Sequence, residues 1–278
     1  MQARANNGRW LVRVEDIDPP REEPGATAAI LGALERYGFE WDGPAIYQAG
    51  SAAAHEAALG RLLEDNQAYP CGCSRRDLAQ APHGPLGTIY PGTCRSGCTA
   101  DETAIRVRTT DSEIAFTDGL QGLQEQRLEI ETGDFIIWRR DGLVAYHLAV
   151  VVDDFEQGVT EIVRGIDLLD STPRQLWLQD LLGYTRSAYL HIPVATHPDG
   201  QKLSKLTGAP AVSEDDPRGT LIQALEALRQ RPPSELRDST IADIWTWASS
   251  HWQVEALVGM TQIAVDCNAI AIGKNGLL

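Results

Sequence analysis

The sequence predicts an α/β fold built on a doubly wound parallel sheet, because strand and helix signals alternate in its first part. Trp10-Leu-Val-Arg-Val14 is a short apolar run that predicts a buried strand ending in an acidic loop. Apolar residues recur at helical spacing over residues 26–37, which predicts an amphipathic helix. A second helix is predicted over residues 51–65.

Composition limits the class of protein. The chain has 278 residues, 43% of them hydrophobic, which is enough for a substantial core in one or two domains. It has no apolar run of 18 residues and no signal peptide, so we expect a cytoplasmic protein with no membrane partner. The net charge of -15 argues against a general nucleic-acid coat protein, but it leaves room for one local basic face.

A short basic loop follows an extended run at residues 192–196. Asp199-Gly200 predicts a tight turn, and Lys202 and Lys205 come next with Ser204 between them. Two ammonium groups three residues apart suit a polyanion such as the phosphates of ATP. The competing interpretation of this loop is a solvated basic turn.

Four of the five cysteines lie within 28 residues, at positions 71, 73, 94 and 98. In a cytosolic chain this clustering favours a metal site over disulfides. Buried free thiols are the alternative.

The remaining elements are read from shorter signals. Residues 105–108 and 116–118 predict strands, and residues 134–142 return the chain to the main sheet. A buried strand at residues 161–163 precedes Arg164, and a helix is predicted to begin at the N-cap Thr172. Two more helices are predicted near residues 221–228 and 241–252, with the tryptophans of the second in the core.

Three motifs in order carry a family resemblance. Tyr146-His-Leu-Ala-Val-Val-Val-Asp-Asp154 is followed by Val163-Arg-Gly-Ile-Asp-Leu168 and then by Lys202-Leu-Ser-Lys205. This order resembles class I aminoacyl-tRNA synthetases of the glutamyl/glutaminyl group, whose "KMSKS" signature is similar to the last motif. The resemblance implies a Rossmann-like catalytic domain.

The resemblance also implies roles for individual residues. Arg13-Val-Glu-Asp-Ile-Asp18 resembles a family segment whose glutamate, here Glu15, faces the ammonium group of the amino-acid substrate. Tyr146 and Arg164 would complete the glutamate site, although a structural ion pair is the other interpretation of Arg164. Lys205, with Lys202 nearby, would be catalytic and stabilise charge on ATP, which is bound with Mg.

The family pattern further implies one zinc ion per chain. Its ligands would be Cys71, Cys73, Tyr90 and Cys94, with Cys98 as the alternative to Tyr90. Four protein ligands leave no open position for chemistry, so this zinc would be structural.

Four regions are expected. Residues 1–69 would form the first part of the catalytic domain, residues 70–133 a zinc-binding insertion, residues 134–212 the second part of the catalytic domain, and residues 213–278 a helical C-terminal region.

The chain departs from the family at its start. No strand with an Arg-Phe-Ala-Pro-Ser-Pro-like segment and no "HIGH"-type motif precedes Arg13. We favour a start codon assigned too late over a truly shortened chain, because the other motifs are intact.

The short C-terminal part favours one group within the family. Together with Asp18-Pro-Pro-Arg21 and Tyr90-Pro-Gly-Thr-Cys94 it resembles the glutamyl-Q tRNA(Asp) synthetases. Such enzymes activate L-glutamate with ATP and transfer it to queuosine in tRNA(Asp). The alternatives are a truncated glutamyl-tRNA synthetase and a catalytically inactive tRNA- and zinc-binding remnant. We expect a monomer.

Overall fold

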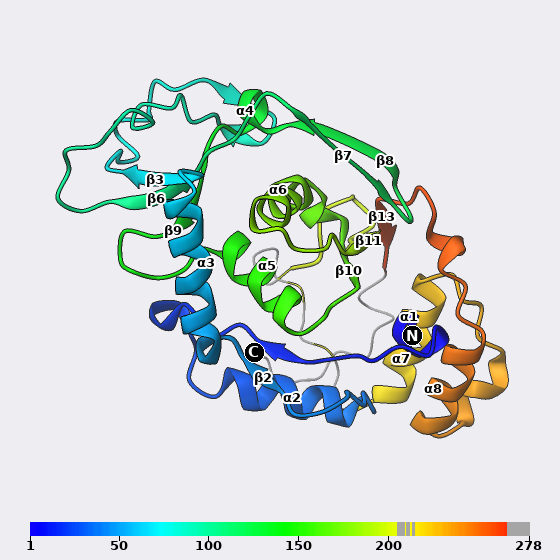
Figure 1. Ribbon diagram of the computed structural model, residues 1–278. Coiled ribbons are helices and arrows are strands. Elements are labelled where there is room, and N and C mark those ends of the chain that lie inside the picture. Colours follow the sequence, from blue (N-terminus) through cyan, green and yellow to red (C-terminus); the bar gives the residue numbers. More distant parts are fainter. Residues whose placement is uncertain (205–208, 210–211, 213–214, 266–278) are drawn as a thin grey trace. The chain divides into compact units, whose positions relative to one another are not determined.

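Three helices and a small sheet enclose the larger apolar core. Helices α3 (Ala52–Glu64), α5 (Tyr146–Glu156) and α6 (Thr172–Leu182) pack against one another, and α3 and α5 also contact the sheet (Figure 1). The sheet is antiparallel in the order β3 (Ala68–Cys71), β6 (Ala104–Val107), β9 (Phe135–Trp138). Helix α5 is buried continuously from Leu148 to Asp153, which explains the run of apolar residues in its sequence.

The computed structural model describes residues 1–204, 209, 212 and 215–265. The chain forms two compact units. One unit contains residues 15–19 and 47–190, and the other contains residues 1–14, 20–46 and those from His191 onward. None of the helices in the described part of the chain has the length and apolar character needed to cross a membrane.

Two hairpins extend the unit built around residues 47–190. A small one joins β4 (His83–Gly84) to β5 (Gly87–Thr88), and a longer one joins β7 (Glu113–Asp118) to β8 (Gly122–Arg127). The Asp118 carboxylate accepts the backbone N–H groups of Leu120 and Gln121, both at 2.9 Å, and so closes the longer hairpin. The same unit contains η2 (Gln48–Ser51), α4 (Leu128–Glu131), β10 (Glu161–Gly165) and η3 (Ile166–Ser171), and β10 pairs with β11 (Ala188–Ile192).

The other unit has a separate helical core. Its elements are α1 (Gln2–Ala5), β1 (Arg13–Val14), α2 (Ala26–Arg36), α7 (Pro217–Ala227), η5 (Ser234–Asp238), α8 (Ile241–Ser250), η6 (Val254–Leu257) and the parallel pair β12 (Val194–Thr196) and β13 (Gln262–Ala264). Two short elements, η1 (Pro19–Arg21) and β2 (Ile46–Tyr47), lie at its boundaries. A capping box between Thr240 and Asp243 starts α8. The indole of Trp245 donates to the Tyr37 carbonyl at 2.8 Å, which joins α8 to the end of α2.

Most predicted helices are confirmed within one or two residues, including α2, α3 and α8, and Trp245 and Trp247 pack against the core as expected. The predicted strand at residues 10–14 is shorter, because the Trp10 N–H donates to the Asp42 carboxylate instead of to a neighbouring strand. Helix α5 and strand β8 had no counterpart in the sequence prediction.

The predicted α/β class is confirmed, but the described strands do not form one doubly wound parallel sheet. They are two to six residues long and form several small sheets, of which the β12–β13 pair is parallel and those containing β3–β9 are antiparallel. Strands this short bury little of a sheet face, so the helices form most of the core.

Candidate active site and metal centre

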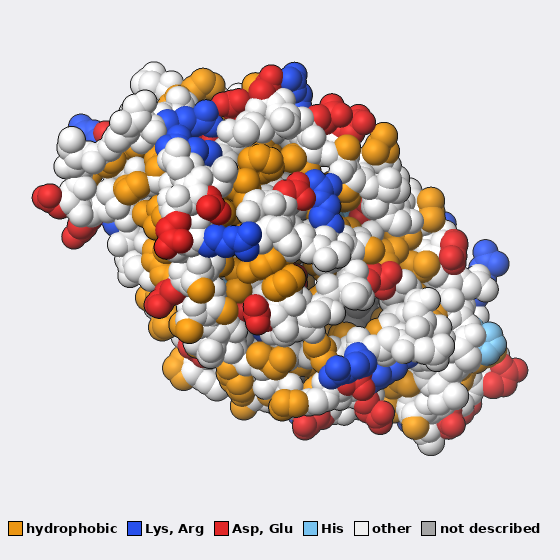
Figure 2. Space-filling view, in the orientation of Figure 1, with side chains coloured by type: hydrophobic (Ala, Val, Ile, Leu, Met, Phe, Trp, Pro, Cys, Tyr) orange, Lys and Arg blue, Asp and Glu red, His pale blue; other side chains and the backbone are white. Residues whose placement is uncertain are grey.

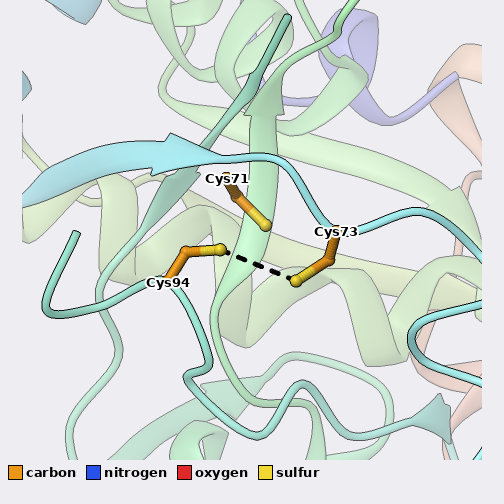
Figure 3. A group of neighbouring side chains, drawn as sticks. All are labelled: Cys71, Cys73 and Cys94. Atoms are coloured by element: carbon orange, nitrogen blue, oxygen red, sulfur yellow. Dashed lines mark hydrogen bonds between the residues drawn. The ribbon is translucent and has the colours of Figure 1, made fainter. Parts of the chain in front are cut away.

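Three cysteine side chains converge at the end of β3. Figure 3 shows Cys71, Cys73 and Cys94 pointing toward one another, and their sulfur atoms all lie within 4.8 Å of each other. The Tyr90 hydroxyl joins them, 3.3 Å from Cys71 Sγ and 3.7 Å from Cys73 Sγ. The structure therefore brings together the four residues predicted to bind zinc.

Backbone geometry holds this cluster in place. Cys71 is fixed by the β3–β6 ladder, where it lies opposite Ala104. Tyr90 is fixed by a bridge to Gly133, whose φ of +66° and close approach to Tyr90 exclude a side chain. A Cβ atom at Gly133 would lie 2.4 Å from the Tyr90 carbonyl oxygen.

The donor set fits a tetrahedral zinc ion. With Zn–S bonds of about 2.3 Å, two ligand sulfurs of a tetrahedral site lie about 3.8 Å apart. Cys73 and Cys94 are 3.6 Å apart, close to that value before any adjustment. Cys98 is partly buried nearby but is not a member of the group whose sulfurs lie within 4.8 Å of one another.

A guanidinium group lies against the thiol cluster. Arg106 donates through Nε to Cys71 Sγ at 3.3 Å, and its guanidinium carbon lies 3.9 Å from the centre of the Tyr90 ring. A positive charge here would offset part of the negative charge of several thiolates around one metal ion. Burial raises the pKa of the Cys73 thiol to about 11 when no cation is bound.

The residues predicted to bind glutamate belong to one unit of the structure. Glu15 is exposed directly after β1, and Tyr146 is the first residue of α5, with 38% of its surface exposed. Arg164 lies in β10 and donates to the Thr172 hydroxyl at 2.8 Å. The shared role of the three side chains in binding glutamate stays a prediction.

The charge of Arg164 and the phenol of Tyr146 both influence the buried Tyr189. Burial raises the pKa of Tyr189 to about 12, and the Arg164 charge opposes this while the Tyr146 phenol adds to it. The Arg164 guanidinium lies 5.3 Å from the centre of the Tyr189 ring. The Thr172 hydroxyl and the face of the Tyr189 ring therefore help to position Arg164.

Of the two lysines in the basic loop, the structure describes only Lys202. Lys202 is exposed and forms an isolated bridge with Thr196 across the predicted Asp199-Gly200 turn, where the Gly200 N–H donates to the His197 carbonyl at 2.9 Å. Lys205 lies outside the described residues. The catalytic roles of both stay predictions.

Two residues of chemical interest were not identified from the sequence. His147 follows Tyr146, and Arg174 lies in the first turn of α6. The available signal was weak: a positive charge in the first turn of a helix is unfavourable with respect to the helix dipole, which indicates a role outside the helix itself.

Comparison with known sequences gives a family match over most of the chain. Residues 1–237 match the family described as "tRNA synthetases class I (E and Q), catalytic domain". A glutamyl-Q tRNA(Asp) synthetase of Pseudomonas fluorescens is 53% identical over 94% of this chain and 86% of its own length. The corresponding protein of Thiobacillus denitrificans is 51% identical over 92% of this chain and 86% of its own length.

Solved structures with the same fold are more distant in sequence. A glutamate tRNA ligase from Elizabethkingia meningosepticum, in complex with its amino acid, has a TM-score of 0.77 at 18% identity. A glutamate-tRNA synthetase from Elizabethkingia anophelis has a TM-score of 0.78 at 19% identity. Each covers 97% of this chain, which spans 62% and 63% of their respective lengths.

The family match over residues 1–237 includes the thiol cluster, the helices α5 and α6 and the motifs that first indicated the family, and the two synthetases above are 53% and 51% identical to this chain. The chain belongs to the class I tRNA synthetases of the glutamyl and glutaminyl group, and within it to the glutamyl-Q tRNA(Asp) synthetases.

Proposed function

We propose that this protein activates L-glutamate with ATP and transfers the glutamyl group to the queuosine base of tRNA(Asp). The observation that carries the proposal is about 50% identity over more than 90% of the chain with several proteins of that name. Arg164, whose guanidinium lies against the buried Tyr189 ring, belongs to the same unit as Tyr146 and Glu15, which supports an amino-acid site in that unit.

The reaction has two steps. The glutamate carboxylate attacks the α-phosphorus of ATP, a phosphorus–oxygen bond forms, and pyrophosphate leaves. A hydroxyl group of the queuosine base then attacks the glutamyl carbonyl, an ester forms, and AMP leaves. Magnesium bound with ATP offsets phosphate charge in the first step.

This chain supplies the groups that position the reactants. Lys205, assisted by Lys202, would stabilise charge that develops on the transferring phosphate. Glu15 would bind the ammonium group of glutamate, and the planar fork of Arg164 would bind a carboxylate. Tyr146 would supply a hydroxyl contact and one wall of the site.

Glutamate-dependent exchange of pyrophosphate into ATP, measured without tRNA, tests the first step. We expect exchange with glutamate and much less with glutamine or aspartate. Transfer is then measured with radioactive glutamate on tRNA(Asp) that carries or lacks queuosine. Equal labelling of both tRNAs would indicate charging at the 3′ end, as in a glutamyl-tRNA synthetase, and absence of exchange would indicate an inactive remnant. Either result would overturn the proposal.

We further propose that Cys71, Cys73, Tyr90 and Cys94 hold one structural zinc ion that keeps the insertion in shape. Metal analysis of the purified protein should find about one zinc per chain. Cys73→Ser should lose the metal, whereas the matched variant Cys98→Ser should keep it, because Cys98 lies outside the cluster. Loss of zinc in the Cys98 variant would exclude Tyr90 as the fourth ligand.

The proposal also includes the oligomeric state, the cellular compartment and the domains of the enzyme. We expect a monomer in the cytoplasm, where its tRNA and ATP are available. The four regions given above remain our proposal for its domains, with residues 70–133 as the zinc-binding insertion.

A further inference from the structure

A cavity of about 290 Å³ lies in the unit that contains the predicted glutamate residues, and one of its lining residues, His147, follows Tyr146 directly. Thr88 and Arg106 line it from the β4–β5 hairpin and β6, and His147 and Arg174 line it from α5 and α6. Residues of the predicted insertion and of the helices α5 and α6 therefore share this cavity. Its volume is near the lower end for small-molecule sites, which fits one or two chemical groups of a larger ligand.

Two polar atoms buried in this region lack partners within the described chain. They are Nε of Arg174 and Nδ1 of His147. Buried donors and acceptors are nearly always satisfied, so an unsatisfied pair on one cavity indicates a missing ligand or water. The Arg174 guanidinium donates only to the carbonyl oxygen of Asp170, at 3.2 Å.

The charges that face the cavity favour an anion. Arg174 and Arg106 both line it. The Asp170 carboxylate favours the charged form of Arg174, but the hydrogen bond between the two residues runs to the Asp170 backbone carbonyl, while Arg106 is bonded to Cys71 Sγ and to the Asp134 carbonyl. Asp134 also lines the cavity, but its carboxylate is occupied by Arg95, Tyr69 and Thr109. A guanidinium group such as that of Arg174, with a buried N–H left over, suits a phosphate, which it binds through several hydrogen bonds at once.

The imidazole adds a neutral group. Burial, with the charges of Arg174 and Arg164, lowers the pKa of His147 to about 3, so the ring is uncharged at neutral pH. A neutral ring nitrogen can exchange a hydrogen bond with a hydroxyl group. The cavity thus offers a place for an anion on the arginines and for a hydroxyl on the histidine.

We propose that this cavity binds the acceptor segment of the RNA substrate, with a backbone phosphate on Arg174 and a hydroxyl of the acceptor nucleotide on His147. The inference rests on the proposed function and names where its second substrate enters. An attacking hydroxyl must come close to the glutamyl carbonyl, and His147 adjoins Tyr146, with ring centres 5.4 Å apart. Arg174 acts here as an RNA-binding residue and takes no part in activation of glutamate.

The test compares Arg174→Gln with Arg186→Gln. Both variants lose one positive charge, but Arg186 forms a surface ion pair with Asp180 and does not line the cavity. Binding of queuosine-containing tRNA(Asp) is measured as a function of salt concentration, and ATP–pyrophosphate exchange is measured without tRNA. Thermal melting of each variant checks the fold.

We expect Arg174→Gln to weaken tRNA binding about tenfold or more and to lower the slope of log affinity against log salt by about 0.7, the value for one phosphate contact with a single strand. Arg186→Gln should change neither, and Arg174→Lys should keep most of the slope. Exchange without tRNA should stay unchanged in all three.

An unchanged slope in Arg174→Gln would overturn the inference. So would a raised KM for glutamate with normal tRNA binding, which would assign the cavity to the amino acid. Wild-type protein that binds tRNA but shows no glutamate-dependent exchange would instead contradict the proposed function, and the salt slopes would still be readable.

Discussion

Single residues in this protein are held by dense sets of hydrogen bonds, and Asp134 is the clearest example. Its buried carboxylate accepts from the Tyr69 hydroxyl, from the Thr109 N–H at 2.8 Å and from Arg95 Nε at 2.6 Å. Burial opposes ionisation, but these bonds outweigh it and hold the pKa of Asp134 below its ordinary value. The carboxylate anchors the segment between the thiol cluster and β9.

We predict that Asp134→Asn lowers the free energy of unfolding by about 3 kcal/mol or more at neutral pH, since it removes one partner of a buried ion pair. Because the pKa of Asp134 is depressed in the folded state, its contribution is present above the ordinary pKa and is lost as pH falls through the lower one. Urea denaturation should therefore show a difference between wild type and variant that shrinks below about pH 5. A difference that is constant with pH would refute this assignment.

Substitution of a single residue, Glu15, tests the predicted amino-acid site. Glu15→Gln keeps the shape of the side chain and removes its charge, so the KM for glutamate in ATP–pyrophosphate exchange should rise about tenfold or more. The KM for ATP should stay near that of the wild type. Glu22→Gln, which changes another exposed carboxylate, serves as the control. Equal effects of both variants would show that only general charge matters.

Among the elements, the strand β3 and the segment from Tyr90 to Gly133 decide the geometry of the metal centre. Tyr90 reaches the sulfurs because its backbone runs beside Gly133, with the Tyr90 N–H donating to the Thr132 carbonyl at 3.2 Å. Gly133 thus allows the Tyr90 backbone to come close, and the residues next to Gly133 in the sequence do not indicate this role.

Gly133→Ala should lower the free energy of unfolding by about 2–5 kcal/mol, because a methyl group would meet the Tyr90 backbone and φ is positive. It should also reduce the zinc content. Gly142→Ala is the matched control: Gly142 has a φ of +83° but no atom within 4 Å of an added Cβ, so only about 1 kcal/mol of backbone strain is expected there. Similar losses measured for the two variants would remove crowding as the cause.

At the scale of the whole molecule, charge limits how the protein can bind RNA. The net charge is -15, and basic side chains form small separate groups among acidic ones on the face seen in Figure 2. Non-specific nucleic-acid binding depends on many phosphate contacts, which such a surface does not supply.

We therefore predict little binding of random duplex DNA at physiological salt, while tRNA(Asp) with queuosine still binds. Fluorescence anisotropy with labelled DNA and tRNA measures both affinities. If the two nucleic acids bind equally well, recognition by a local site such as the Arg174 cavity is excluded as the main contribution.

The sequence by itself determined the family, several of the helices and the identity of the clustered thiols. Helical periodicity is a local property, which explains why α2, α3 and α8 could be predicted closely. The ordered motifs around Tyr146, Arg164 and Lys202 identified the family because their residue types are set by chemistry. The choice of Tyr90 over Cys98 came from the resemblance, and the structure places the Tyr90 hydroxyl, not the Cys98 sulfur, among the other sulfurs.

Only the tertiary structure decided which distant residues share one space. The short strands and small sheets depend on long-range pairing, and competing side-chain contacts such as that of Asp42 with Trp10 leave no local signal. The cavity that Arg106, His147 and Arg174 line is formed by three elements that are separate in the chain. Unsatisfied groups such as Arg174 Nε can be recognised only when all of their neighbours are in place, since burial and hydrogen bonding are properties of the folded chain.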